Sequence, residues 1–277
     1  MTEFDGNDWA LILGGSSGFG LATAHALSRH GMSVCVVHRD RRGAMQRVGR
    51  EFDEIRAHGH GFVSMNLDAL DPAGRTTALD TLAGNMAEGA HVRVLLHSIA
   101  YGNLKPIAPA ARTPEGAAGG GAARALIDDE DMARTIYSMG TSLLSWVQAV
   151  FVRGLFADDA RVFGLTSEGN QVAWPGYGAV SAAKSALESV SRSIAVEFAP
   201  HGIRCNIVQP GVTDTPALRA IPGNDRMREV AEARNPFKRL TLPEDVAGVI
   251  CLLCTPEAAW INGAIIPVDG GEHIAPM

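Results

Sequence analysis

The feature that most constrains the fold is an apolar run that ends in a glycine-rich turn near the start of the chain. The run "WALILGG" leads into "FGLATAHALSRHG", whose apolar residues recur at helical spacing and which stops at Gly31. This order predicts a strand, a tight turn and a helix. Such a unit is typical of folds in which strands and helices alternate.

The turn has the sequence "LGGSSGFG", with Gly14, Gly18 and Gly20 at the spacing G-x3-G-x-G. Glycines at such a junction let backbone N–H groups approach a pyrophosphate, whose negative charge is favoured by the N-terminus of the following helix. Similar turns arise wherever a helix packs closely on a strand, but the place of this one in the first strand–helix unit favours dinucleotide binding. The residues of the turn that we expect to bind the cofactor are Gly14, Ser16, Ser17, Gly18, Phe19 and Gly20.

Further β-rich apolar runs follow along the chain, separated by segments with helical periodicity. The runs are "SVCVVHR", "GFVSMN", "VRVLLHSIA", "ARVFGLTS", "IRCNIVQP" and "AIIPVDGG", with one helix expected around residues 72–87. Strands that alternate with helices imply right-handed crossovers and a parallel sheet covered on both faces. The 277 residues, 46% of them hydrophobic, suffice for one sizeable core. The sequence therefore predicts an α/β fold, a single doubly wound Rossmann-type domain over residues 1–277.

One segment departs from this alternation. Residues 101–131, "YGNLKPIAPAARTPEGAAGGGAARALIDDED", contain three prolines and little periodicity. We expect a long loop there. Loops of this length in a compact domain are usually functional or disordered, so both a flap beside the site and an inert insertion stay open.

Charge and cysteine content exclude several classes of protein. A formal net charge of −6 and a pI near 5.8 argue against a nucleic-acid or membrane-surface binder. No secretory leader or membrane-spanning run is apparent, so we expect a cytoplasmic protein. The four cysteines, Cys35, Cys205, Cys251 and Cys254, are too few for a disulfide framework. The Cys251-x-x-Cys254 pair lacks a second ligand pair and reads as part of a buried helix, so we expect no metal site.

The end of the second expected strand usually chooses between the two nicotinamide cofactors. An acidic residue there accepts hydrogen bonds from the adenosine ribose, whereas an arginine pairs with a 2′-phosphate. In "VVHRDRRG", His38 stands where the acid would be and Arg39 follows. NADP(H) is therefore expected in preference to NAD(H), although Arg39 could instead belong to a solvated helix start.

Five stretches of the chain occur in an order that resembles one enzyme superfamily. They are the glycine turn, "LHSIA", Tyr177 and Lys184 in "WPGYGAVSAAKSAL", "IRCNIVQPGVTDT" and the terminal "IIPVDGGEHIAPM". Over nearly the whole chain they are similar to the short-chain dehydrogenases/reductases. The Tyr-x6-Lys spacing, "HSIA" in place of "NNAG" and the "PVDGG…IAPM" ending resemble the divergent branch of enoyl-acyl-carrier-protein reductases. The stretch "TDTPALRAIPGNDRMREVAEARNPFKRL" is most similar to the type III, NADPH-using kind.

The chain also departs from the pattern of ordinary superfamily members. Leu13 stands where most relatives have threonine before the glycine turn, and Met139 falls where ordinary members place a structural asparagine. Val180 fills the ordinary tyrosine position, four residues before Lys184. Many enoyl reductases have a second tyrosine ten residues before the catalytic one, but that position is Ser167 here, as in the type III enzymes.

The spacing of Tyr177 and Lys184 has a chemical meaning. Seven residues along a helix return nearly to the same face about 10 Å further on, whereas four residues give roughly 6 Å. The longer spacing suits a substrate whose hydride-accepting carbon is not bonded to its polarised oxygen, as in an enoyl thioester. We expect Tyr177 to donate to the developing enolate. A tyrosine and a lysine on one helix face can also be only a core aromatic and a solvated amine.

The resemblance implies roles for further residues. Lys184 would hold the nicotinamide ribose and favour proton movement at Tyr177, and Ser167 would add a donor or order a water. Asp68 would meet the adenine, with Asn66 as the alternative. The other expected cofactor contacts are Ser98, Ile99 and Ala100 near the ribose and nicotinamide, and Pro210, Gly211, Thr213 and Thr215 near the carboxamide and phosphates.

Residues 214–240 are expected to form the substrate loop. Residues 216–240 hold six Lys/Arg and three Asp/Glu, which could dock an acidic carrier protein or a CoA phosphate, or form an ordinary solvated helix face. The resemblance also implies a homotetramer and a place in fatty acid biosynthesis.

The predicted function is NADPH-dependent reduction of a trans-2-enoyl thioester carried on acyl carrier protein or CoA. One alternative is a short-chain ketoreductase or alcohol dehydrogenase that acts on a carbonyl or hydroxyl. The other is a non-catalytic NADP(H)-binding regulator, suggested by Met139 and by the altered residue before the glycine turn.

Overall fold

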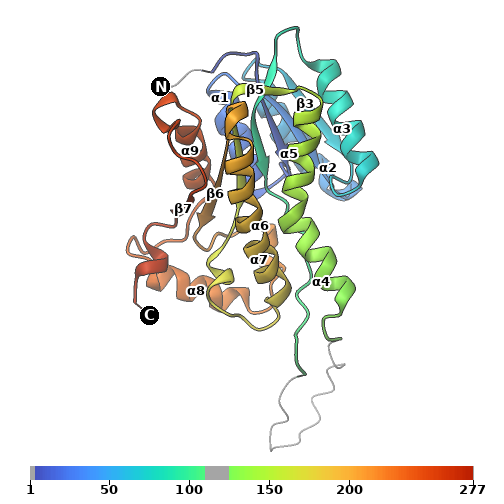
Figure 1. The fold of residues 1–277 in the computed structure, drawn as a ribbon. Coiled ribbons are helices and arrows are strands. Elements are labelled where there is room, and N and C mark those ends of the chain that lie inside the picture. Colours follow the sequence, from blue (N-terminus) through green and yellow to red (C-terminus); the bar gives the residue numbers. More distant parts are fainter. Residues whose placement is uncertain (1–3, 110–124, 277) are drawn as a thin grey trace, which may run out of the picture.

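Seven parallel strands form one sheet in the order β3-β2-β1-β4-β5-β6-β7 (Figure 1). This computed structural model describes residues 4–109 and 125–276. The strands are β1 (Asp8–Leu13), β2 (Ser33–His38), β3 (Phe62–Asn66), β4 (His91–His97), β5 (Phe156–Leu165), β6 (Ile203–Pro210) and β7 (Ile265–Val268). The predicted doubly wound α/β fold is confirmed.

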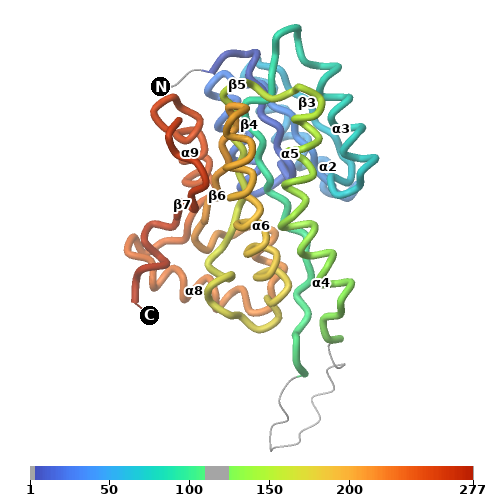
Figure 2. Tube along the Cα trace, in the orientation of Figure 1, coloured from blue at the N-terminus to red at the C-terminus, as the bar shows by residue number. Residues whose placement is uncertain are grey.

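Helices cover both faces of the sheet. They are α1 (Gly18–Arg29), α2 (Met45–Arg56), α3 (Pro72–Asn85), α4 (Asp129–Ile136), α5 (Ser142–Val152), α6 (Gly178–Glu197), α7 (Pro216–Arg219), α8 (Asn224–Arg234) and α9 (Pro243–Leu253). Two short helical turns, η3 (Glu168–Asn170) and η6 (Glu272–Ile274), lie near the ends of β5 and β7. In the view of Figure 2, α5 and α6 lie in front of the strands.

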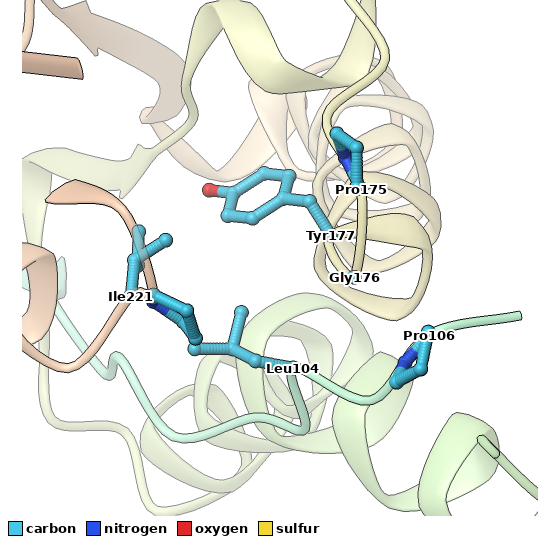
Figure 3. A pocket seen from close by; sticks show the side chains of 7 residues that line it. Leu104, Pro106, Pro175, Gly176, Tyr177 and Ile221 are labelled. Atoms are coloured by element: carbon cyan, nitrogen blue, oxygen red, sulfur yellow. The ribbon is translucent and has the colours of Figure 1, made fainter. Parts of the chain in front are cut away.

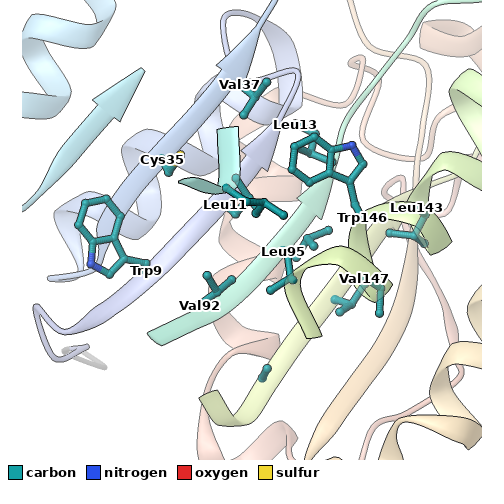
Figure 4. Close-up of a cluster of buried hydrophobic side chains, with 14 of the residues drawn as sticks. Trp9, Leu11, Leu13, Cys35, Val37, Val92, Leu95, Leu143, Trp146 and Val147 are labelled. Carbon is teal, nitrogen blue, oxygen red and sulfur yellow. The ribbon is translucent and has the colours of Figure 1, made fainter. Parts of the chain in front are cut away.

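Alternate residues of the central strands face opposite layers of helices. In β1, Ala10 and Ile12 pack with α1, α2 and α9, whereas Leu11 and Leu13 pack with α3, α5 and α6. Because both faces are buried, the strands read as continuous apolar runs in the sequence. Figure 4 shows part of the cluster that packs with α3, α5 and α6, in which the Trp146 side chain lies near Leu13. The Trp146 indole N–H donates to the Ala69 carbonyl at 2.9 Å, so this buried polar group is satisfied.

The strand order predicts a ligand crevice at the carboxyl ends of the central strands. After β1 the chain builds outward through β2 and β3, and then returns to add β4 on the other side of β1. Open α/β sheets bind ligands at such a reversal, outside the carboxyl ends of the strands. The ends of β1, β4, β5 and β6 at Leu13, His97, Leu165 and Pro210 therefore define where a site is expected.

The predicted loop over residues 101–131 ends earlier than expected. Its described parts, 101–109 and 125–128, contain neither helix nor strand, and α4 begins at Asp129. The Asp128 side chain accepts from the Asp131 N–H at 2.8 Å and starts the helix there. The glycine-rich middle of the predicted loop, residues 110–124, lies outside the described residues.

All four cysteines are buried, and the predicted burial of the Cys251-x-x-Cys254 pair is confirmed. Cys251 and Cys254 lie at the end of α9, and Cys35 and Cys205 lie within β2 and β6. Burial raises the pKa of Cys35 and of Cys205 to about 12 and that of Cys251 to about 11, and it also raises the pKa of Cys254. Within residues 4–109 and 125–276, no helix is long and apolar enough to cross a membrane.

Candidate active site

The glycine turn touches the end of β4. Gly14 has φ +84°, and a Cβ there would lie 2.4 Å from the Ser98 carbonyl oxygen. A Cβ at Gly20 would lie 2.3 Å from the Gly14 oxygen. Only a residue without a side chain fits at either position. Of the two residues after Ser98, Ile99 packs partly buried on the core and Ala100 is exposed.

The segment that follows β6 reaches the same turn. A Cβ at Gly18, which has φ +53°, would lie 3.3 Å from Thr215 Cγ2. After Pro210 ends β6, the Thr213 hydroxyl donates to the Gly211 carbonyl at 3.0 Å. Three segments that the sequence assigns to the cofactor thus meet at one place. The contacts of the individual residues with a cofactor stay predictions.

The beginning of α1 offers donors to an anion. Ser17 precedes the helix, its side chain makes no hydrogen bond to the helix, and the first turn has no acidic residue. The first N–H groups of α1 are therefore available to a negative ligand. The Ser16 carbonyl accepts from Arg47 at 3.3 Å, and the Phe19 side chain packs against the α1, α2 and α9 cluster. These donors and the glycines of the turn, which have no room for a side chain, fit a dinucleotide pyrophosphate.

Arg39 and Asp68, both expected to contact the cofactor, pair with each other. Arg39 Nη1 lies 2.6 Å from Asp68 Oδ2, and the guanidinium lies 4.7 Å from the centre of the Tyr101 ring. Both partners are exposed, so the pair is accessible to a ligand. The alternative adenine contact, Asn66, instead exchanges two hydrogen bonds with the backbone of Asp40, both at 3.0 Å.

Tyr177 and Ser167 lie together at the carboxyl end of β5. Tyr177 stands directly before α6, and its hydroxyl lies 3.3 Å from Ser167 Oγ. A Cβ at Gly169 would lie 2.4 Å from Tyr177 Cε1, so the η3 turn packs closely against the ring. Burial, partly opposed by the hydrogen bond with Ser167, raises the pKa of Tyr177. The phenol therefore stays protonated at neutral pH and can donate.

Lys184 lies deeper along α6. Its Nζ donates to the Leu165 carbonyl at 2.7 Å, at the same strand end that carries Ser167. Its burial lowers the pKa to about 8. Between the two residues, Val180 is buried and packs with Met139 and Ala183. The position four residues before Lys184 thus belongs to an apolar contact.

A small apolar pocket of about 100 Å³ borders the Tyr177 ring. Figure 3 shows this ring facing Leu104 and Ile221 across the pocket. The lining residues are Leu104, Pro106, Pro175, Gly176, Tyr177, Ile221 and Pro222. They come from the expected loop, from the approach to α6 and from the expected substrate segment. The described part of the 101–131 loop therefore lies beside the site, which favours a functional loop over an inert insertion.

Tyr177 is the tyrosine that lines this pocket. The chain has three tyrosines. Tyr101 lies under the Arg39 guanidinium, and Tyr137 donates from its hydroxyl to the Leu70 carbonyl at 3.2 Å. A phenol that reaches a substrate in the pocket must therefore come from Tyr177.

Most basic residues of the 216–240 segment are already paired. Four of the six form ion pairs with carboxylates: Arg219 and Arg228 with Asp214, Arg234 with Glu168 and Glu272, and Arg239 with Asp245. Pairing of this kind neutralises the local excess of charge. It weakens the interpretation of the segment as a docking surface for an acidic carrier.

Two buried features near the site are absent from the sequence prediction. Arg234 lies between Glu168 and Glu272, which come from three different parts of the chain, so no local spacing reveals them. His97 ends β4 beside Ser98, and its Nε2 lies 2.8 Å from Ser142 Oγ. Burial and the nearby Lys184 lower the pKa of His97 to about 3, so it is neutral. Its place at the start of "HSIA" is the signal that could have found it.

One group of potential metal ligands exists among the described residues. The ligand atoms of His25, Glu51 and Glu54 lie within 4.8 Å of one another. They belong to α1 and α2, and none of them lines the pocket beside Tyr177.

Comparison with known proteins agrees with this geometry. The family model described as enoyl-(acyl carrier protein) reductase matches residues 14–273. A cis-4-hydroxycyclohexanecarboxylate dehydrogenase of Sinomonas cyclohexanicum is 30% identical over 95% of this chain and 95% of its own. A 1-cyclohexenylcarbonyl-CoA reductase of Streptomyces collinus is 29% identical over 96% of this chain and 86% of its own.

A solved structure has the same fold. The short-chain dehydrogenase from Burkholderia cenocepacia J2315, crystallised in complex with NADP, superposes with a TM-score of 0.77. It is 23% identical, and the match covers 96% of this chain and 98% of that one. The glycine turn, Tyr177 and Lys184 all lie toward the carboxyl ends of the strands. The family model matches almost the whole chain, so the chain belongs to the short-chain dehydrogenase/reductase superfamily, in its enoyl-(acyl carrier protein) reductase family.

Proposed function

We propose that this oxidoreductase uses NADPH to reduce the C=C bond of a trans-2-enoyl thioester carried on CoA or acyl carrier protein. The observation that carries the proposal is the position of Tyr177. It stands seven residues before Lys184 and lines an apolar pocket, while the position four residues before Lys184 is the buried Val180. The phenol therefore stands further from Lys184 along the chain than the tyrosine position that suits carbonyl reduction, which is Val180 here.

The site chemistry follows from where charge develops. A nicotinamide held by the glycine turn would supply the hydride that adds to the β-carbon of the substrate. Negative charge then collects on the thioester oxygen, which is three bonds from the β-carbon, and the α-carbon takes up a proton from water. The Tyr177 hydroxyl donates to this oxygen, and Ser167, 3.3 Å from the phenol, holds the hydroxyl or adds a second donor. Donors that meet charge only as it forms lower the barrier.

The lining of the pocket agrees with an acyl substrate. Leu104, Pro106, Ile221 and Pro222 present apolar surface next to the Tyr177 ring. Such a wall binds the hydrocarbon part of an acyl group and excludes water from the enolate. The relative from Streptomyces collinus, named as a CoA-ester reductase, supports this class of substrate.

A second candidate is oxidation or reduction at a hydroxyl or carbonyl carbon. It is favoured by the Ser167–Tyr177 contact, because two donors 3.3 Å apart can polarise a single carbonyl oxygen. The relative from Sinomonas cyclohexanicum, named as a dehydrogenase of a hydroxy acid, supports it too. The third alternative, a regulator without turnover, is disfavoured because Tyr177, Ser167 and Lys184 all lie at one strand end.

Turnover with defined substrates distinguishes these functions. Purified protein with NADPH and crotonyl-CoA is expected to consume the reduced cofactor, followed by its absorbance, and to form butyryl-CoA. The comparison is a panel of ketones with NADPH and of alicyclic hydroxy acids with NADP+. Activity on that panel alone supports the second candidate, and NADPH binding without turnover on any substrate supports the regulator.

Arg39→Ala is expected to narrow the preference for NADPH over NADH. The guanidinium lies exposed at the end of β2, where a 2′-phosphate would exchange for Asp68 as its partner. An arginine–phosphate contact can be bidentate and is lost entirely in alanine. The measurement is the ratio of kcat/KM with the two cofactors. Asp68→Asn, which frees Arg39, is the control and should leave the preference for NADPH intact or increase it. An unaltered ratio in Arg39→Ala would discard this role.

The pH dependence should report Lys184. Burial lowers its pKa to about 8, so the ammonium is charged below that pH and loses its proton as the pH rises. If this charge assists Tyr177, kcat/KM, which reports groups of the free enzyme, falls as pH rises through about 8. In Lys184→Met the residual activity should lack this alkaline limb. Persistence of the limb in that variant would assign it to another group.

A further inference from the structure

Arg234 connects the turn that follows Ser167 with the segment that follows β6. Its Nη1 and Nη2 donate to the Glu168 carboxylate at 3.2 and 2.5 Å, and Nη2 also lies 3.3 Å from Glu272 Oε1. The Arg234 side chain is 14% exposed and that of Glu272 is 2% exposed. One guanidinium at the end of α8 therefore holds two carboxylates from separate parts of the chain, with little access of water.

Glu168 leads to the phenol. It follows Ser167 directly and begins the η3 turn, whose next residue, Gly169, packs against the Tyr177 ring. The amides of Gln171 and Val172 donate to the Glu168 carbonyl at 2.9 and 3.0 Å, which makes the turn one rigid unit. Fixing the Glu168 side chain therefore fixes the turn that carries Ser167 and supports Tyr177.

Glu272 leads to the other half of the site. Its carboxylate accepts the Val212 N–H at 3.2 Å, and a Cβ at Gly211 would lie 2.7 Å from Glu272 Oε2. Gly211 and Val212 lie in the segment expected to face the nicotinamide carboxamide. The Val212 carbonyl is held as well, because it accepts from the Thr241 N–H at 3.2 Å.

We propose that Arg234 is a positioning residue, which sets the Ser167–Tyr177 donor pair at a fixed place relative to the backbone segment that receives the nicotinamide. The inference rests on the proposed function in one respect: the nicotinamide, as hydride donor, and Tyr177, as hydrogen-bond donor, must both reach the same substrate. Because a shift of about 1 Å between reacting groups can lower a rate about 100-fold, such a link acts on kcat rather than on affinity. α8, which is part of the expected substrate segment, thereby also becomes part of the frame of the site.

Arg234→Gln is the test, with Arg204→Gln as the matched control. Arg204 is also partly buried, and its Nη1 lies 2.6 Å from Asp159 Oδ1. It stands near the beginning of β6, at the opposite end of that strand from Gly211 and Val212. Arg234→Gln is expected to lower kcat about tenfold to 100-fold, with a much smaller change in the KM for NADPH. Arg204→Gln should keep the wild-type kcat. Arg234→Lys, which keeps the charge but not the fork, is expected to fall between the two.

Hydrogen exchange gives a readout that needs no turnover. In Arg234→Gln the Val212 amide and the amides of residues 171 and 172 should both exchange faster, whereas Arg204→Gln should change neither. Faster exchange at only one of the two segments, or an equal loss of kcat in both variants, would overturn the proposal. If the wild type acts on ketones and not on crotonyl-CoA, kcat is measured with the ketone. The proposed function then fails while the role of Arg234 is still decided.

Discussion

Tyr177→Phe is expected to lower turnover about 100- to 1000-fold, the effect of removing one donor to a developing oxyanion. NADPH should bind nearly as tightly as to the wild type, because the cofactor contacts expected from the glycine turn and from Thr215 do not involve the phenol. The ring can keep its packing on Gly169, so the fold should be retained. The measurement is kcat with crotonyl-CoA together with an NADPH binding titration.

Tyr137→Phe is the control for this substitution. It removes a hydroxyl of the same kind, which donates to the Leu70 carbonyl and does not line the pocket. Its effect on turnover should be small. Wild-type turnover in Tyr177→Phe would remove Tyr177 from the mechanism, and equal losses in both variants would point to stability instead.

Gly14→Ala is expected to abolish tight NADPH binding and to lower the free energy of unfolding by about 2 kcal/mol or more. A left-handed backbone costs a residue with a side chain about 1–2 kcal/mol. The new Cβ would in addition lie 2.4 Å from the Ser98 carbonyl oxygen, so the end of β4 must move away from the turn. Fluorescence titration with NADPH measures the loss of binding, and denaturant unfolding measures the change in the free energy of unfolding.

Gly49→Ala is the control, and it is expected to raise the free energy of unfolding instead of lowering it. Gly49 lies within α2, has nothing within 4 Å of a built Cβ, and is not among the glycines with positive φ. Replacing glycine by alanine inside a helix stabilises it by roughly 0.5–1 kcal/mol. If Gly14→Ala were as stable as the wild type, the turn would have room that the structure does not give it.

The sheet could be predicted because its strands are buried on both faces. A strand such as β1 or β2 then appears as an unbroken apolar run, bounded by turn residues that are equally visible. The start of α4 was placed less well, because the 101–131 segment carries no periodicity. The residue that begins the helix, Asp128, is one of three aspartates in "DDED", and only its bond to the Asp131 amide distinguishes it from the other two.

Site residues were predictable where the chemistry is local or follows a resemblance. Tyr177, Lys184 and Ser167 belong to two neighbouring segments, and the structure brings them to one strand end. The Arg39–Asp68 pair could not be foreseen as a pair, because it bridges two strands through side chains. In the sequence, Arg234 stands out only as one member of a basic segment. Its two carboxylate partners depend on how α8 meets the η3 and η6 turns, which no sequence spacing encodes.

The burial of all four cysteines bears on the proposed substrate. An α,β-unsaturated thioester is a Michael acceptor, and an accessible thiolate would add to its β-carbon and block the protein covalently. Thiols must ionise before they react in this way, and here their pKa values are raised by burial, to about 12 in Cys35 and Cys205. With the proposed substrate, none of the four buried thiols is therefore expected to be alkylated.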